Sequence, residues 1–142
     1  MWIREPAFLI DIIPEINDID ELGHVNNAVY VRWLEQCAWQ HSNQLGLTLS
    51  VFQQLDRAMA VIRHEIDYLA SSYSGNLLQM ATWITDMDKL RVTRQFQLIN
   101  QQTGQTILQA QTVFCCIQMT TGKPKRMPQK LVMCYERALI TR

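Results

Sequence analysis

The sequence predicts an α+β domain in which one long helix packs against an antiparallel sheet of about five strands. Residues 27–45 form a long stretch with helical periodicity. Most of the chain after residue 58 consists of β-rich stretches separated by short, turn-like breaks, and such connections favour antiparallel pairing. The 142 residues suffice for one domain with its own core, and no linker or repeat divides them. We therefore expect a single domain over residues 1–142, with the sheet curled around the helix.

A short strand is predicted near the start of the chain. Residues 8–13 are mostly apolar and β-branched, and Pro14 ends the run. The polar loop 15–26 leads from this strand into the long helix.

The long helix has clear boundaries in the sequence. From Asn27 to Leu45, apolar side chains recur with a period close to 3.6 residues, and His41 is the one polar residue in that stripe. Asn26 or Asn27 is a suitable N-cap, and Gly46 suits the position just past the C-terminus. Tryptophans widen the apolar side, so we expect the helix to be mostly buried.

The remaining elements follow in the second part of the chain. Residues 50–53 fit a capping box and predict a short helix that ends before Ala58. Pro128 predicts the start of another short helix in the tail, residues 128–142. Four strands lie between these helices, over residues 59–69, 77–87, 91–100 and 106–119.

Composition excludes several classes of protein. Apolar residues make up 48% of the chain and charged residues 18%, which is typical of a soluble globular protein. The formal net charge is zero, so we expect neither nucleic acid nor an anionic membrane as a partner. No apolar run approaches the roughly 20 residues that a membrane-spanning helix needs, and the first residues lack the layout of a secretory signal. We therefore expect a cytoplasmic protein.

The four cysteines indicate packing, not chemistry. Cys37, Cys115, Cys116 and Cys134 show no metal-ligand spacing and no CxxC pair. Free cysteines are commonly buried, so we expect reduced thiols, and we expect neither a metal nor another cofactor.

The most informative feature of the chain is the run from Asp20 to Tyr30. Its first eight residues hold two carboxylates, an imidazole and two side-chain amides. The long helix follows at once, so these groups lie where backbone N–H groups are unpaired and the helix dipole is positive. Acyl transfer needs a base or nucleophile beside such an oxyanion site, and the run therefore predicts acyl-transfer chemistry.

Three motifs together suggest a known family. The specific one is the string Asp-x-x-Gly-His-Val-Asn-Asn-x-x-Tyr, from Asp20 to Tyr30. The others are a strand ending in Tyr-Leu before a turn at Gly75, and a late Thr-Gly-Lys-Pro turn at residues 121–124. With these motifs the chain resembles the acyl-CoA thioesterases of the 4-hydroxybenzoyl-CoA thioesterase type, within the hotdog superfamily. The resemblance implies a hotdog fold and the hydrolysis of an acyl-CoA to free acid and CoA.

The resemblance places the catalytic carboxylate at Asp20. Asp20 would attack the thioester carbonyl or activate a water as general base, whereas an ordinary loop aspartate would only cap a turn. His24 would polarise the thioester oxygen, orient the attacking group or protonate the leaving thiolate, or else serve as a structural hydrogen-bonding residue. Gly23 would let the backbone approach the substrate closely or adopt a positive φ.

The first turn of the helix supplies the expected substrate contacts. The oxyanion donors should be backbone N–H groups among Val25 to Val29. Asn26 and Asn27 favour helix capping over direct substrate contact, although the caps set where these N–H groups point. Tyr30 lies one turn beyond Asn26 and would hold the loop, line the pocket or pack in the core.

Other acidic residues near the run are expected to be structural. Asp18 fits a solvated loop residue, and a metal site made of Asp18, Asp20 and His24 lacks a further ligand nearby. Glu35 would be costly if buried alone, so we expect it to pair with Arg32 or a polar group of a strand, and not to act as a second catalytic acid.

The resemblance also implies a homodimer or homotetramer, because members of this superfamily commonly build active sites across a subunit interface. Residues 68–72 are then candidates for the contribution of one subunit to the site of the other. The basic cluster of Lys123, Lys125 and Arg126 would meet the phosphates of CoA or form a solvated turn. The residues expected to shape the acyl pocket are Trp33, Trp39, Phe52 and Met59.

Departures from relatives leave alternatives open. Plant acyl-carrier-protein thioesterases have an asparagine two residues before the histidine, where this chain has Leu22. Hotdog hydratases favour an Asp-x-Asn-Pro-x-His layout, and no proline separates Asp20 from His24 here. The alternatives are an acyl-carrier-protein thioesterase, a hydratase that leaves the thioester intact, and a non-catalytic module that binds acyl-CoA or an acyl carrier protein.

Overall fold

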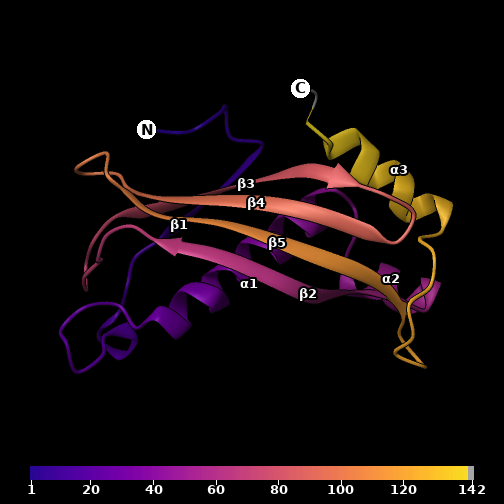
Figure 1. The fold of residues 1–142 in the computed structure, drawn as a ribbon, viewed down its shortest axis with the longest axis horizontal. Helices are drawn as coiled ribbons and strands as arrows, with labels where there is room; N and C mark the ends of the chain where they lie inside the picture. Colours follow the sequence, from indigo (N-terminus) through magenta and orange to yellow (C-terminus); the bar gives the residue numbers. More distant parts are fainter. Residues whose placement is uncertain (141–142) are drawn as a thin grey trace.

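The computed structural model describes residues 1–140, and within them the expected α+β architecture is confirmed. Figure 1 shows the strands side by side, with α1 lying along one face of the sheet. All neighbouring strands are antiparallel, in the order β1-β3-β4-β5-β2. The strands are β1 Phe8–Ile12, β2 Arg57–Tyr68, β3 Leu78–Met87, β4 Arg91–Asn100 and β5 Thr106–Gln118. The helices are the 3-10 turn η1 Ile16–Asp18, α1 Asn27–Gln44, α2 Leu49–Leu55 and α3 Gln129–Ala138.

The start of α1 is capped as the sequence suggests, but the helix is less buried than expected. The Asn26 side chain accepts a hydrogen bond from the Ala28 N–H at 2.9 Å. One side of α1 packs against the sheet, while the other is open and leaves Trp39 47% exposed. The sheet is a single layer and covers α1 from one side, which hydrophobic periodicity alone cannot reveal. The buried residues are Val29, Tyr30, Trp33, Leu34, Cys37, Ala38, His41 and Ser42.

Alternate residues of β4 form the centre of the core. Val92, Arg94, Phe96 and Leu98 occupy successive inward positions, because side chains alternate across a strand. Phe96 and Leu98 belong to the hydrophobic cluster under α1, and Val92 belongs to a second cluster closed by α2 and α3. Arg94 therefore lies at the boundary between two apolar clusters.

The N-terminal segment covers part of the opposite face of the sheet. The Trp83 indole N–H donates to the carbonyl of Glu5 at 2.7 Å. The Gln97 amide donates to the Met1 carbonyl and accepts from the Ile3 N–H, each at 2.8 Å. These bonds satisfy the polar groups that the segment buries against β3 and β4.

The remaining elements follow the sequence closely, with one local difference. α2 begins after Thr48 and not at Ser50, because the Thr48 hydroxyl accepts the Val51 N–H at 3.3 Å. α3 begins directly after Pro128, and the last part of the predicted tail helix, residues 141–142, lies outside the described residues. The four cysteines are free thiols. Within residues 1–140, no helix is long and apolar enough to cross a membrane.

Candidate active site

The polar loop before α1 closes into a compact turn. The Asp20 N–H donates to the His24 carbonyl, and the Gly23 N–H donates to the Asp20 carbonyl, both at 3.0 Å. Ile19 and Val25 form an isolated antiparallel bridge at the base of this turn. Gly23 has a φ of +87°, a conformation that side chains with a Cβ rarely adopt, which agrees with the expected need for glycine here.

The Asp20 carboxylate holds the turn with one of its two oxygens. Its Oδ1 accepts the Leu22 N–H at 2.9 Å, and the residue is half-buried. Its Oδ2 has no hydrogen-bond partner within residues 1–140. A turn-capping role and a chemical role are therefore compatible in this side chain, since each uses a different oxygen.

One backbone N–H group at the mouth of α1 is free to bind an oxyanion. Among the described residues, the Asn27 N–H has no hydrogen-bond partner. It lies at the first position of the helix, where the dipole is positive. The other N–H groups of residues 25–29 donate, in order, to the Ser72 carbonyl, the Asp18 carbonyl, the Asn26 side chain and the Asn26 carbonyl.

A hollow of about 290 Å³ lies beside this mouth. It brings the predicted residues His24, Val25, Asn27 and Tyr30 together with the segment after β2. That segment was expected to reach the site of a partner subunit, and it lines the helix mouth of its own chain. Three predicted residues lie outside the lining: Asp20, Gly23 and Asn26. The lining consists of His24, Val25, Asn27, Tyr30, Tyr68, Leu69, Ala70 and Ser71.

Tyr30 ties α1 to this segment. Its hydroxyl lies 2.6 Å from the Ser72 hydroxyl, and both side chains are buried. Burial raises the pKa of Tyr30, so the phenol stays neutral and can share a proton with the serine. Tyr30 thus lines the hollow and packs in the core, and its hydroxyl holds the segment after β2 beside the mouth.

The other acidic residues differ from expectation in their partners. Asp18 accepts the Glu15 N–H at 2.9 Å and pairs with Arg32 at 3.7 Å. Glu35 is exposed, and no ion pair joins it to another residue within 1–140. The expected Glu35–Arg32 pair is therefore wrong, because Arg32 pairs with Asp18 instead.

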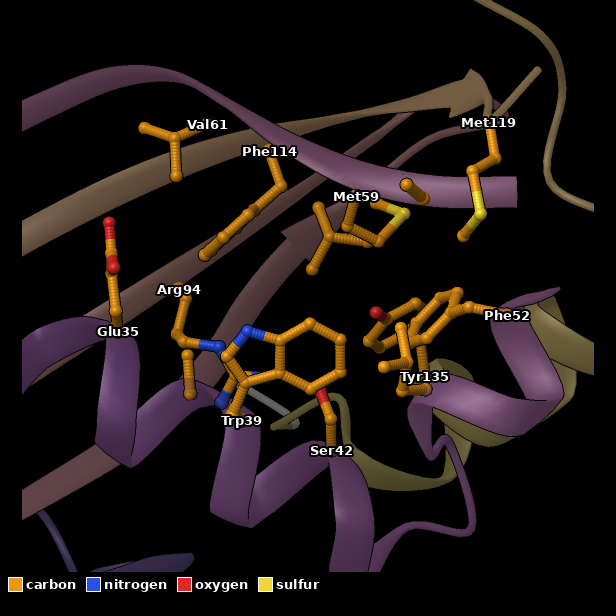
Figure 2. A pocket seen from close by; sticks show the side chains of 14 residues that line it. Glu35, Trp39, Ser42, Phe52, Met59, Val61, Arg94, Phe114, Met119 and Tyr135 are labelled. Carbon is orange, nitrogen blue, oxygen red and sulfur yellow. The ribbon is translucent and has the colours of Figure 1, made fainter. Parts of the chain in front are cut away.

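A second cavity, of about 280 Å³, lies further along α1 (Figure 2). Glu35, Trp39 and Ser42 reach into it from α1, and Met59, Val61 and Phe114 face them from the strands. Of the four residues expected to shape an acyl pocket, Trp39, Phe52 and Met59 line this cavity, whereas Trp33 is buried elsewhere in the core. The complete lining is Glu35, Ala38, Trp39, Ser42, Leu49, Phe52, Ala58, Met59, Val61, Val92, Arg94, Phe114, Met119 and Tyr135.

Arg94, which lines this cavity, and His41, which does not, are not among the predicted functional residues. The Arg94 Nη1 lies 2.7 Å from Nδ1 of His41. Each of them interrupts an apolar pattern in the sequence. His41 is the one polar residue in the apolar stripe of α1, and Arg94 is the one charge in the inward phase of β4. The sequence could not show that His41 and Arg94 contact each other.

The basic turn and the helix mouth lie at opposite ends of β2. Lys123, Lys125 and Arg126 are exposed, and the Arg126 carbonyl accepts from Nε of Arg57 at 3.2 Å. The turn is therefore anchored beside the start of β2, whereas the hollow at the mouth adjoins its end. Within the described residues, no group of His, Cys, Asp and Glu side chains could hold a metal ion.

Comparison with known proteins decides the family. Residues 14–133 match the model of the thioesterase-like superfamily. The chain belongs to this superfamily. Membership supports thioester hydrolysis as its general chemistry, and it confirms the resemblance at the level of the superfamily. No curated protein sequence matches the chain.

Solved structures similar to this thioesterase-like protein include enzymes and one CoA complex. The 1,4-dihydroxy-2-naphthoyl-CoA thioesterase of Synechocystis is 20% identical, with a TM-score of 0.81 over 90% of this chain and 94% of its own. The DHNA-CoA thioesterase of Staphylococcus aureus is 19% identical, with a TM-score of 0.84 over 92% and 89%. A hypothetical protein of Staphylococcus aureus in complex with CoA is 17% identical, with a TM-score of 0.86 over 100% and 90%. These likenesses confirm the hotdog fold.

Proposed function

We propose that this thioesterase-like protein hydrolyses acyl-CoA thioesters at the mouth of α1. The observation that supports this most is the free Asn27 N–H at the positive end of the helix, in a hollow shared with His24. A carbonyl oxygen that gains negative charge during hydrolysis is stabilised by such a donor. The similar structures named as CoA thioesterases, and the one solved with CoA, support CoA as the thiol carrier.

The proposed reaction uses the two oxygens of Asp20 differently. While Oδ1 holds the turn, Oδ2 would take a proton from a water whose oxygen attacks the thioester carbon. The Asn27 N–H would hold the carbonyl oxygen as the C–S bond breaks. The CoA thiolate would leave and take up a proton, and His24 would orient the water or pass that proton. Direct attack by Asp20, followed by hydrolysis of the resulting anhydride, would give the same acid and free CoA.

We further infer that two copies pair through their β2 strands. Among residues 1–140, β2 is an outer strand bonded only to β5, and it exposes Val61 and Ile62 by 40% and 56%. Unpaired edges with exposed apolar side chains are typical of surfaces that another strand covers. Antiparallel pairing about the middle of β2 would set the start of each strand against the end of the other.

Such pairing would connect the separate parts of the site. In one chain, the helix mouth adjoins the end of β2, while the cavity and the basic turn adjoin its start. In the dimer, the mouth of one subunit would therefore lie beside the cavity and the basic turn of the other. The cavity would hold the acyl group, and Lys123, Lys125 and Arg126 would face the phosphates of CoA.

Hydrolysis of a panel of acyl-CoA thioesters by Asp20→Asn and the parent protein tests the chemistry. Asparagine keeps an oxygen that can accept the Leu22 N–H, so the turn should persist while the base is lost. We expect turnover to fall by at least about a hundredfold. Glu21→Gln is the matched control, because it removes an exposed carboxylate from the adjacent position, and it should retain turnover. Loss of thioester absorbance avoids reaction of a thiol reagent with the four cysteines.

Each alternative function predicts a different result. Activity of Asp20→Asn within a few-fold of the parent would contradict the role of this carboxylate. Tight binding of acyl-CoA without turnover in either protein would indicate a binding module. Turnover of an acyl carrier protein substrate alone would move the assignment to that carrier, and a product mass with the thioester intact would indicate a hydratase.

A further inference from the structure

Arg94 is a buried cation that uses only part of its hydrogen-bonding capacity. It is 2% exposed, on the inward face of β4. Its Nη1 donates to His41 Nδ1 at 2.7 Å and to the Thr82 hydroxyl at 3.4 Å. Neither bond uses the edge formed by Nε and Nη2, and Nε has no partner within residues 1–140.

The groups that surround this guanidinium are neutral. An arginine can only donate, so Nδ1 of His41 must accept, and the imidazole carries no charge. Burial raises the pKa values of Cys37 and Tyr135 to about 12, so both are protonated near neutral pH. No carboxylate pairs with Arg94 among the described residues. A buried charge without a counter-ion is costly, and natural proteins usually supply a partner.

The cavity along α1 gives a ligand access to this charge. Arg94 contributes to its wall, which is otherwise mostly aromatic and aliphatic. The lining also contains the hydroxyl groups of Ser42 and Tyr135 and one carboxylate, that of the exposed Glu35. Figure 2 shows Arg94 between the side chains of α1 and those of the strands. Glu35 is exposed to solvent, whereas Arg94 is buried in the mostly apolar wall, and such a wall suits a ligand with an apolar body and an anionic end.

We propose that this cavity binds an acyl group whose far end carries a carboxylate, and that Nη2 of Arg94 pairs with it. Nε is covered by protein atoms, so the contact is made through Nη2, the guanidinium nitrogen that neither the His41 bond nor the Thr82 bond uses. The preferred substrate is then a dicarboxylic acid held as its monothioester. This inference rests on the proposed function for the thioester end, while the carboxylate end depends only on the cavity and Arg94.

The wild-type protein alone provides the first test. The value of kcat/KM is measured for octanoyl-CoA and for suberoyl-CoA, which have equal chain lengths and end in a methyl group and a carboxylate. A charge-assisted pair with a buried arginine should favour the carboxylate by about ten- to a hundredfold. Equal values, or a preference for the methyl end, would overturn the proposal and leave the proposed hydrolysis intact.

Variants of two arginines on β4 then test whether Arg94 causes the preference for suberoyl-CoA. Arg94→Met should abolish it by lowering kcat/KM for suberoyl-CoA alone, and Arg94→Lys should retain part of it, because lysine keeps the charge but places it differently. Arg91→Met is the matched control, since Arg91 is exposed at the start of the same strand. A preference that survives in folded Arg94→Met would overturn the assignment to Arg94. If that variant does not fold, the wild-type pair of substrates still decides.

Binding of the free acids separates this inference from the hydrolase assignment. Calorimetry with suberate and octanoate needs no turnover, and suberate should bind more tightly to the wild type but not to Arg94→Met. Such binding without hydrolysis of any thioester would support the carboxylate site and contradict the proposed function. Hydrolysis of thioesters with equal binding of both acids would support the proposed function and contradict the carboxylate site.

Discussion

Acid should weaken this protein at a pH where most proteins are unaffected, because its fold contains a neutral histidine beside a buried cation. His41 is 2% exposed, stacks on Phe8 with ring centroids 5.0 Å apart, and accepts a hydrogen bond from Arg94. Burial and the charge of Arg94 lower the pKa of His41 from 6.5 to about 4. Between these two pKa values, His41 therefore binds a proton in the unfolded chain but not in the folded chain.

The sign and the size of the effect follow from this difference. Stability from the neutral imidazole is complete above pH 6.5 and is lost as the pH falls toward 4, where the folded state also takes up the proton. Each pKa unit is worth about 1.36 kcal/mol, so the free energy of unfolding should drop by about 3 kcal/mol across this range. For a domain with a typical stability of about 5–15 kcal/mol, this is a large fraction.

Urea unfolding, followed by tryptophan fluorescence at several pH values between 7.5 and 4.5, measures this drop. His41→Gln is the comparison, because its amide oxygen can accept from Arg94 but does not titrate. The variant should lose most of the pH dependence, even if it is less stable at pH 7.5. The reasoning would be refuted if the free energy of unfolding changed equally with pH in the two proteins, or if that of the wild type stayed constant down to pH 5.

Two further predictions concern the helix mouth and the sheet edge. Tyr30→Phe removes the buried hydroxyl 2.6 Å from Ser72, and leaving the serine unpaired should cost about 1–3 kcal/mol in urea unfolding. The double variant with Ser72→Ala should recover part of that loss, and additive effects would contradict a direct bond. Ile62→Lys places a charge on the exposed edge of β2, and it should shift sedimentation toward the monomer and reduce thioester turnover. The same substitution at Ile16, which is 75% exposed on η1, should change neither, and an unchanged mass for Ile62→Lys would exclude pairing through β2.

The sequence was most informative where structure depends on local interactions. The periodicity of 27–45, the cap at Asn26 and the turns between strands all reflect contacts within a few residues, and the structure has them nearly where predicted. The error over Glu35 had a different cause. Helical spacing shows which residues share a side, but how many sides the sheet covers depends on its curvature and width.

The parts of the site that could not be predicted depend on contacts between distant segments. His41 and Arg94 each break an apolar pattern, but 53 positions separate them, and only packing of α1 on β4 brings them within 2.7 Å. The free N–H of Asn27 likewise depends on distant segments. The neighbouring N–H groups of Val25 and Asn26 donate to the carbonyls of Ser72 and Asp18, and Ser72 lies in the segment that follows β2.

The backbone bonds that close the loop before α1 bear on how the enzyme can evolve. Asp20, Gly23 and His24 are held by main-chain groups, and the base of the loop is fixed by the Ile19–Val25 bridge. Only Gly23 in the tip is tied to a particular residue type by its backbone, so Glu21 and Leu22, which are both exposed, contribute little to the shape of the loop. These two positions can vary without moving the groups beside them, which makes the tip a place where selection or a protein engineer can alter the approach of substrates at little cost to the fold.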